Sequence, residues 1–576
     1  MEYLGTKVGT GYGLGKVLII NDSIPEKLET ELDNLNSNDE INKLNNAINE
    51  VTKNYESIKS ESTEKDIQDL CDFYKMLLAS SSLKAELTAN INEQKKSAIG
   101  SVLLSFHKKE VELSNLDNAY LRERSKDIKD VSDKLVKNLL GIKEINLKEL
   151  KEDTIVVAKE ITPSLLLGGH LDYVKGIVSE IGGKTSHVAI LANTLRIPSV
   201  FGIKNVASVL KDGEMIFVNA NKGLIRTNLT NDDITEINDI IAKDKLLQQD
   251  IKEMVNKKAI TKDGKSFEVT ANAGDITELD KLEGSGLDGI GLFRSEFLFL
   301  NKATAPSEEY LFNVYKNFAE KLNGKTMIIR TLDIGGDKKC SYINIPTEQN
   351  PFLGYRAIRY CLDNKEFFKV SLRAILRASN FGKIMIMYPM ISSIDEVDQA
   401  DSILEEAKNE LALKNIPFDK DIKTGAMVEI PSAAIMANDL LDTCDFLSIG
   451  TNDLTQYGLA VDRGNPQVSY LYNYFNPSII KLIKMTIDAT NTHPDKFVGM
   501  CGEMAADPLG IILLVGLGLN EFSVNLASVL RTKKLITLLN YSDCKKVAEQ
   551  VLSMTSTKDI EALLNDKAKE YFGKYY

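Results

Sequence analysis

The segment 182–187, with sequence GGKTSH, has the composition of a site that handles an anion. Two glycines permit a tight turn, and Thr185 and Ser186 belong to the residue types that cap the start of a helix. His187 would then lie in the first helical turn, where free N–H groups and the helix dipole favour a phosphoryl anion. A neutral imidazole is also a nucleophile that can carry a phosphoryl group. A capped helix with an incidental exposed histidine is the alternative, because such short patterns recur by chance.

A second group of polar residues follows short apolar segments in the C-terminal half of the chain. Its members are Arg294, Arg330, Glu429, Asn452, Asp453, Arg463 and Cys501. Arginine offers paired N–H donors that suit phosphate and carboxylate groups, and carboxylates are the hard oxygen ligands that Mg²⁺ prefers. Together these residues indicate a site for a small polyanion bound with a divalent metal. Taken singly, each could be an ordinary ion pair or, in the case of the cysteine, a small buried hydrophobe.

Eight predicted strands, separated by helical segments, must position this second group. The strands are Glu268–Ala271, Gly289–Leu292, Thr326–Ile329, Ile384–Tyr388, Gly425–Val428, Phe446–Ile449, Phe497–Met500 and Glu521–Val524. This alternation is typical of a (β/α)8 barrel, whose active site lies at the carboxyl ends of its strands. A doubly wound open sheet would produce much the same periodicity, so the strand pattern alone leaves both architectures open.

The N-terminal half has a different texture. Residues 26–140 contain no proline and only one glycine, Gly100, which predicts several long helices. Residues 1–20 and 150–228, on either side, contain short β-rich runs and frequent glycines. We therefore expect an α/β domain into which a helical domain is inserted. Residues 230–258, which contain neither proline nor glycine, predict a helical linker.

Length and composition narrow the class of protein. A chain of 576 residues is longer than one hydrophobic core usually organises, so we expect two to four domains. A net charge of −12 argues against nucleic acid as a partner. Six scattered cysteines without a CxxC motif fit a reducing cytosol. The longest uncharged apolar run, residues 509–519, is too short to span a bilayer, and we read no signal peptide. We expect a cytoplasmic protein without membrane insertion.

Seven motifs, taken in order, resemble those of the Enzyme I family of the bacterial phosphotransferase system, the phosphoenolpyruvate-protein phosphotransferases. The motifs are GGKTSH, GLFRSEFLFL, RTLDIGGDK, NPFLGYRAIR, MVEIP, SIGTNDLTQY with VDRGN, and GMCGEMA. The likeness runs from about residue 150 to residue 540, and residues 120–131 (YLRERSKDIKDV) resemble the family's carrier-binding domain more loosely.

The resemblance implies an α/β multidomain fold. Residues 1–21 and 149–229 would form a phosphohistidine α/β domain, and residues 22–148 an inserted helical domain that binds the carrier protein. A helical linker at 230–260 would lead to a TIM-type (β/α)8 barrel at 261–576, which binds phosphoenolpyruvate and forms a homodimer.

The resemblance also implies roles for individual residues. His187 would take the phosphoryl group of phosphoenolpyruvate and pass it to the histidine-containing phosphocarrier protein HPr, with release of pyruvate, as the first step of sugar transport. Glu429 and Asp453 would bind Mg²⁺, and Cys501 would protonate the enolate carbon. The residues implied to hold phosphoenolpyruvate are Arg294, Arg330, Asn452, Asp453 and Arg463.

Two alternatives share parts of this pattern. Pyruvate phosphate dikinase and phosphoenolpyruvate synthase resemble the same histidine segment and barrel, but they need an additional ATP-grasp domain, for which this chain has a helical insertion instead. A regulatory protein that kept the fold and lost turnover is the second alternative. The presence of His187, Glu429, Asp453 and Cys501 argues against it.

Overall fold

The structure is a computed structural model of the chain. It describes residues 1–576 except 21–23, 26, 33–35, 63–64, 115–118, 143–144, 146, 168–170, 183–186, 301, 303, 337, 339 and 341. For residues 65–66, 119–124, 126, 148, 187, 190 and 194 it describes the backbone alone. The chain divides into two compact units, residues 1–246 and 247–576.

The first unit contains an eight-stranded sheet with strand order β1-β8-β7-β3-β4-β5-β6-β2. Strands β3 to β6 pair in parallel, and the remaining strands pair antiparallel. The strands are β1 Glu2–Leu4, β2 Thr6–Lys7, β3 Tyr12–Ile20, β4 Thr154–Glu160, β5 Val174–Ile181, β6 Ser199–Phe201, β7 Met215–Asn219 and β8 Leu224–Arg226. Segments far apart in the sequence thus share one sheet, because β3 lies beside β4 and β7.

Five helices form the helical block between β3 and β4, as the absence of proline predicted. They are α1 Ser37–Glu61, α2 Lys65–Ala79, α3 Ser81–Asn92, α4 Ala98–Ser114 and α5 Ala119–Leu140. The single glycine of the block has a packing role. A Cβ on Gly100 would collide with the backbone oxygen of Thr30, so α4 can approach the preceding segment this closely only without a side chain there.

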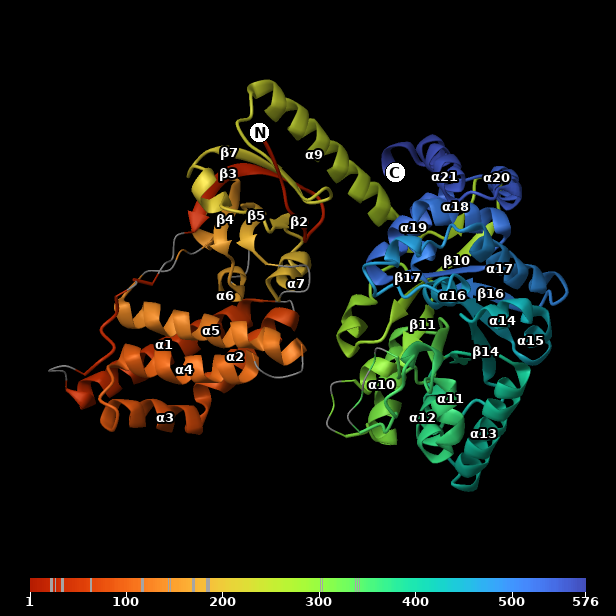
Figure 1. The fold of residues 1–576 in the computed structure, drawn as a ribbon, viewed down its shortest axis with the longest axis horizontal. Coiled ribbons are helices and arrows are strands. Elements are labelled where there is room, and N and C mark those ends of the chain that lie inside the picture. The colour runs from red at the N-terminus through yellow and green to blue at the C-terminus, as the bar shows by residue number, and fades with distance from the viewer. Residues whose placement is uncertain are drawn as a thin grey trace. The chain divides into compact units, whose positions relative to one another are not determined.

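The two faces of the sheet carry different cores because successive strand residues point in opposite directions. Val156 and Ala158 of β4 pack into a core shared with the helical block, whereas Ile155 and Val157 face a smaller core on the other side. Figure 1 shows α1, α2, α4 and α5 gathered on one side of β3, β4 and β5. The short helices are α6 Pro163–Leu166, α7 His187–Thr194 and α8 Val206–Val209.

A single long helix, α9 (Asn231–Lys252), occupies most of the predicted linker. All of its residues are described, and among them only Ile237 is buried. The boundary between the two compact units, at residues 246 and 247, falls within this helix.

The second unit is built on a closed barrel of eight parallel strands. Strand β10 pairs with both β11 and β17, which closes the sheet, so the predicted (β/α)8 architecture is confirmed and the open-sheet alternative is wrong. The strands are β10 Ser266–Ala273, β11 Ile290–Arg294, β12 Met327–Arg330, β13 Ile384–Tyr388, β14 Lys423–Val428, β15 Phe446–Ile449, β16 Phe497–Met500 and β17 Glu521–Asn525. A short strand, β9 (Ala259–Ile260), pairs antiparallel with β10.

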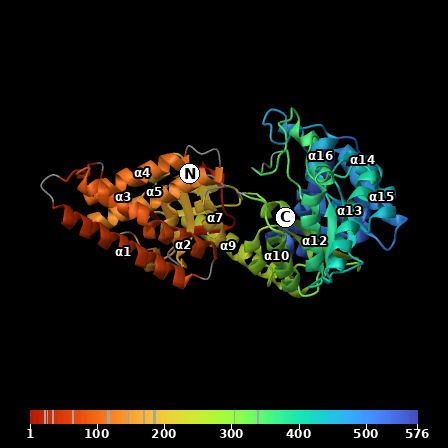
Figure 2. The ribbon, with the colours of Figure 1, turned by 90° about the horizontal axis from the view of Figure 1, so that it is seen from below.

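Helices surround the barrel, and the views in Figures 1 and 2 both show α10, α12 and α13 next to one another on its outside. The helices are α10 Glu308–Lys321, α11 Ile358–Asp363, α12 Lys365–Ser379, α13 Ile394–Leu413, α14 Pro431–Ile435, α15 Ala437–Thr443, α16 Thr451–Gly458, α17 Pro477–Asp488, α18 Pro508–Leu517, α19 Val529–Thr537, α20 Tyr541–Ser553 and α21 Thr557–Phe572. The most apolar segment of the sequence forms α18, which is buried beneath α20 and α21.

The barrel interior has its own small apolar core. It consists of Leu292, Ile328, Met387, Met427, Phe446 and Cys501. Outward-facing strand residues instead join the large core beneath the surrounding helices. Among the helices that the structure describes, none is both long and apolar enough to cross a membrane.

Candidate active site

Arg330, the last residue of β12, is the centre of a buried ion-pair network at the carboxyl end of the barrel. Its guanidinium pairs with Glu296 and lies 3.0 Å from Oδ2 of Asp333. Lys338 donates to Oε1 of Glu296 at 2.9 Å and to Oδ2 of Asp333 at 2.8 Å. Burial lowers the pKa of Arg330, but the carboxylates of Glu296 and Asp333 raise this pKa by more than burial lowers it. The guanidinium therefore stays charged.

Arg356 extends this network across the barrel mouth. It is almost fully buried, and its Nη2 donates to Oδ1 of Asp333 at 2.8 Å and to Oδ2 of Asp453 at 3.4 Å. Its Nη1 donates to the Tyr457 hydroxyl at 3.2 Å. Burial raises the pKa of Asp333, but the cations of Arg330, Lys338 and Arg356 hold it well below its usual value. Loops from distant parts of the chain are thus fixed to one another.

Two further carboxylates lie beside the network. Glu429 directly follows β14, is buried, and accepts a hydrogen bond from the Met390 N–H at 2.7 Å. Asp453 lies in the first turn of α16. Burial, with the charges of Asp453 and Asp333, raises the pKa of Glu429 to about 8. A cation bound here would relieve this repulsion and allow Glu429 to ionise.

Asn452 and Arg463 bring the loop after β15 to the same end of the barrel. The Asn452 side chain accepts a hydrogen bond from the Glu503 N–H at 3.2 Å, which joins α16 to the residues after β16. Arg463 lies with its Nη2 at 4.0 Å from Oδ1 of Asp453, and 39% of its side chain is exposed. Arg463 is therefore an exposed cation at the edge of the site, whereas Arg330 is a buried cation within it.

Cys501 directly follows β16 and is 6% exposed. Its Sγ lies 3.7 Å from the carbonyl oxygen of Ile449. Burial raises the pKa of the Cys501 thiol to about 11. The positive charges of Arg330 and Arg294 lower this pKa, and the negative charge of Glu429 raises it. The group is therefore a protonated thiol at neutral pH, within electrostatic range of the arginines that end β11 and β12.

Comparisons with known proteins agree with this geometry. The chain matches three family models: "PEP-utilising enzyme, PEP-binding domain" at residues 248–541, "PEP-utilising enzyme, mobile domain" at 150–223, and "PEP-utilising enzyme, N-terminal" at 4–124. It is 38% identical to the phosphoenolpyruvate-protein phosphotransferase of Haemophilus influenzae over 98% of each chain. That of Mycoplasma pneumoniae is 43% identical over 80% of each chain, and that of Listeria monocytogenes is 36% identical over 99% of this chain and 100% of the other.

The chain belongs to the phosphoenolpyruvate-protein phosphotransferase family. The family predicted from the sequence motifs is therefore confirmed, and with it the class of enzyme, a phosphotransferase that uses phosphoenolpyruvate.

The structure separates the predicted site residues of this phosphotransferase into two sets. One set lies at the carboxyl ends of the barrel strands and in the loops that follow them: Arg294, Arg330, Glu429, Asn452, Asp453, Arg463 and Cys501. The other is His187, the first residue of α7 in the first unit. The side chain of His187 and the preceding residues 183–186 lie outside the described part of the chain.

The geometry adds residues to which the sequence analysis gave no role. Arg356 and Lys338 make the ion pairs described above, yet neither follows a strand directly. Arg356 is brought in by the loop before α11, where the Ala357 N–H donates to the Ile334 carbonyl at 3.0 Å. A side chain at Gly335 would collide with Arg356. Their presence in the motifs RTLDIGGDK and NPFLGYRAIR was the one signal that the sequence offered.

The residues present suit a divalent metal completed by water and substrate. Among the described residues there is no group of three or more histidine, cysteine, aspartate or glutamate side chains that could hold a metal. Glu429 and Asp453 offer the carboxylate oxygens that suit Mg²⁺, an ion that keeps several positions for water and substrate oxygens. Several buried polar atoms of this region lack a hydrogen-bond partner within the described structure: Glu296 Oε2, Arg330 Nε, Arg356 Nε and Thr451 Oγ1.

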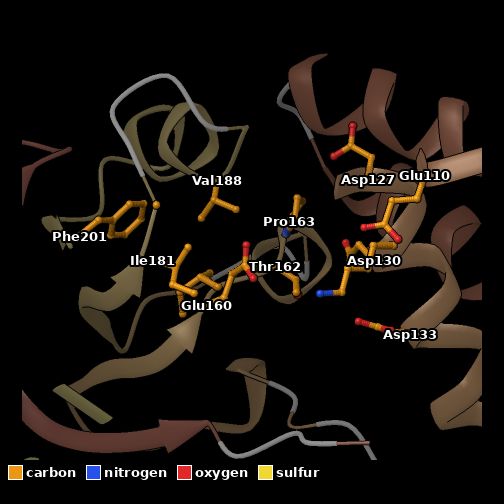
Figure 3. Close-up of a pocket in the computed structure, with 13 residues that line it drawn as sticks. Glu110, Asp127, Asp130, Asp133, Glu160, Thr162, Pro163, Ile181, Val188 and Phe201 are labelled. Atoms are coloured by element: carbon orange, nitrogen blue, oxygen red, sulfur yellow. The ribbon is translucent and has the colours of Figure 1, made fainter. Parts of the chain in front are cut away.

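In the first unit, a cavity of about 280 Å³ lies beside α7, between the helical block and the sheet. Figure 3 shows the carboxylates of Glu110, Asp127, Asp130, Asp133 and Glu160 on its walls. Lys129 is the one basic residue among the described residues that line it. Val188, which follows His187, also lines this cavity. The described lining of this cavity is therefore mainly acidic, in contrast to the arginine-rich barrel mouth.

Proposed function

We propose that the chain transfers the phosphoryl group of phosphoenolpyruvate to its own His187 and then to the phosphocarrier protein HPr, as the first step of sugar uptake by the phosphotransferase system. The observation that carries this proposal is the buried network of Arg330 and Arg356 with four carboxylates at the barrel mouth. It presents fixed cations to a small polyanion, and the family membership supplies the reaction class.

In this proposal the substrate is held by five residues of the barrel. They are Arg294, Arg330, Asn452, Asp453 and Arg463. The buried Arg330 is already fixed by its carboxylate partners, so it binds the phosphate without reorganising. Arg463, at the exposed rim, meets the substrate as it enters. Arg356 and Lys338 hold the carboxylates in place around the bound anion.

We assign Glu429 and Asp453 as the ligands of Mg²⁺. The metal, when bound, supplies positive charge to the transferring phosphate and the developing enolate. The raised pKa of Glu429 supports this assignment, since a neutral carboxyl at pH 7 becomes an anionic ligand once a cation is near.

Cys501 completes the reaction in this proposal. Departure of the phosphoryl group leaves an enolate, whose methylene carbon needs a proton to become the methyl group of pyruvate. The thiol is protonated at neutral pH because burial raises its pKa, and it lies close to Arg294 and Arg330. It is therefore the acid available on that side of the pocket.

His187 is the group that connects the two halves of the reaction. It lies on a different compact unit from the barrel, so charging and discharging require a change in the arrangement of the units. We propose domains at 1–21 with 149–229, at 22–148 and at 261–576, joined by a linker at 230–260. The carboxylates described in the cavity beside α7 would complement positive charge on the surface of the carrier protein. We further propose a homodimer formed through the barrel domain and a cytoplasmic location.

A reconstituted reaction tests this function. Purified chain, phosphoenolpyruvate, Mg²⁺ and HPr should give one pyruvate per phosphorylated HPr, with neither product formed when Mg²⁺ is removed by a chelator. Pyruvate release without phosphorylation of HPr would contradict the proposed acceptor. Phosphorylation that needs ATP would indicate a dikinase instead.

A further inference from the structure

The interior of the barrel is polar where its first and last strands meet. We call this region the seam wall, and it consists of Thr270, Asn272, Glu521 and Ser523. Strands β10 and β17 close the barrel, with Thr270 opposite Ser523 in the register. Much of the remaining interior is lined by apolar side chains such as Leu292 and Met427. Apolar contacts impose little direction, so the hydrogen bonds that orient groups inside the barrel come from the seam wall and from buried Ser448 of β15, which contacts the Cys501 thiol.

The lower part of the seam wall is a tight cluster. The Thr270 hydroxyl donates to Oε1 of Glu521 at 2.6 Å, and Glu521, Thr270 and Ser523 are all buried. A Cβ added to Gly291 would collide with the side-chain oxygens of all three residues. These oxygens therefore converge on one point, which a glycine at position 291 leaves free of a side chain.

The upper part of the seam wall reaches Cys501. Ser523 Oγ donates to Oδ1 of Asn272 at 2.7 Å. A hydroxyl can donate or accept, but a carbonyl oxygen can only accept, so the Cys501 carbonyl fixes the side of the amide on which the NH₂ group lies. That NH₂ group donates to the carbonyl oxygen of Cys501 at 3.1 Å. Asn272 thus joins the acid proposed for the enolate to the buried, hydrogen-bonded residues of the seam wall.

We propose that Asn272 is a positioning residue, which acts through the Cys501 backbone to hold the thiol on one face of the enolate. This inference rests on the proposed role of Cys501 as the acid. In the step concerned, the S–H bond breaks and a C–H bond forms at the methylene carbon. The sulfur keeps the electron pair as a thiolate, and it recovers a proton from water before the next turnover.

A positioning role has a stereochemical consequence. The enolate is planar, so a fixed acid delivers its proton to one face, whereas a misplaced acid lets solvent protonate either face. Phosphoenolpyruvate that carries deuterium at one defined position on its methylene carbon, turned over in tritiated water, gives pyruvate with a chiral methyl group. The enantiomeric excess of that methyl group reports the position of the acid and is insensitive to general loss of stability.

The test compares Asn272→Ala with Asn525→Ala. Asn525 lies opposite Asn272 on β17, and its side chain accepts a hydrogen bond from the Ser528 N–H, three residues further along the chain. We expect Asn272→Ala to lose about 10–100-fold in kcat, with KM for phosphoenolpyruvate changed less than about twofold, and to form a partly racemic methyl group. Ser523→Ala should show the same pattern more weakly, and Asn525→Ala should match the wild type.

Three results would overturn the inference. The first is wild-type kcat and full chirality in Asn272→Ala. The second is a reduced rate with unchanged enantiomeric excess, which would make Asn272 a structural residue only. The third is full chirality in Cys501→Ser at a wild-type rate, which would remove the acid while leaving phosphoryl transfer intact. Failure of the wild type to phosphorylate HPr would instead contradict the proposed function itself.

Discussion

The two units, to which we assign successive steps of one phosphoryl transfer, differ in the charge of their described cavity and site residues. In the barrel, Arg330 and Arg356 are buried and cross-linked to carboxylates, so the cations are fixed before substrate arrives. Beside α7, Asp130 and other carboxylates dominate the part of the cavity wall that the structure describes, where Lys129 is the one basic residue. The comparison teaches that the barrel is built to hold a small anion. The acidic lining described beside α7 instead fits our proposal that a basic carrier protein binds to this unit.

His187→Ala should have the largest effect, because it removes the proposed reaction of the first unit and leaves substrate binding by the barrel unchanged. Phosphorylation of the chain and of HPr should be abolished, because no nucleophile remains to accept the phosphoryl group. Mg²⁺-dependent binding of phosphoenolpyruvate, measured by calorimetry, should remain within about twofold of the wild type, because the barrel residues are unchanged. Loss of this binding in His187→Ala would show that the two sites are not independent.

Cys501→Ser tests the chemistry of the barrel alone. Turnover should fall by roughly 10²–10⁴-fold, the loss typical of removing a positioned acid, while binding of substrate and Mg²⁺ persists. Deuterium incorporation at the methyl carbon of pyruvate should slow in step with turnover. Near-normal turnover with a modest loss of stability would instead identify Cys501 as a buried apolar residue.

A pair of arginine substitutions distinguishes fixed from rim cations. Arg330→Met leaves Glu296 and Asp333 with one cation fewer in a buried setting, and it should cost roughly 3–5 kcal/mol of folding free energy as well as substrate binding. Arg463→Met, at a 39% exposed side chain, should weaken substrate binding but cost less than about 0.5 kcal/mol of stability. Thermal unfolding and calorimetry check both. Equal destabilisation would contradict the distinction.

The pH dependence of stability at Asp130 provides a test of the acidic cavity in the first unit. Its carboxylate accepts hydrogen bonds from the Ser164 N–H at 3.0 Å and the Ser164 hydroxyl at 2.7 Å, and burial raises the pKa of Asp130 to about 6. A carboxyl whose pKa is raised by folding contributes stability that is complete below its unfolded pKa and is lost as pH rises through about 6. The loss is on the order of 2–3 kcal/mol.

Hydrogen exchange of the Ser164 amide in the full chain measures this effect, because that amide is bonded to the Asp130 carboxylate. After correction for intrinsic rates, protection should fall between pH 4 and 7 in the wild type and stay level in Asp130→Asn, the matched neutral isostere. Parallel profiles in the two proteins would contradict the assignment.

Much of the barrel could be predicted from the sequence because its signals are local. Apolar runs of four to six residues mark buried parallel strands, and the predicted Ile384–Tyr388, Phe446–Ile449 and Phe497–Met500 agree with β13, β15 and β16. The strand pattern alone could not predict barrel closure, because closure depends on the pairing of β10 with β17, segments separated by most of the unit. The resemblance of the motifs to a known family supplied that part of the prediction. In the first unit, the pairing of β3 with β7 is non-local in the same way.

The residues of the candidate site also differ in whether local sequence signals could predict them. Residues that directly follow strands, such as Glu429 and Cys501, were predictable because a barrel presents those positions at its mouth. Arg356 and Asn272 were not. Arg356 comes from a loop whose approach depends on Gly335, and Asn272 owes its orientation to the Cys501 carbonyl and to a serine on the last strand. Such contacts are properties of the folded barrel and leave no periodic signal in the sequence.

The central claim, that the phosphoryl group passes from the barrel to His187, is tested most directly by locating the label after incubation with ³²P-phosphoenolpyruvate and Mg²⁺. We expect an acid-labile, base-stable label on the peptide that contains His187, and its transfer to HPr when the carrier is added. The wild type should carry it, and His187→Ala should carry none. A label on any other residue, or an acid-stable label, would contradict the account.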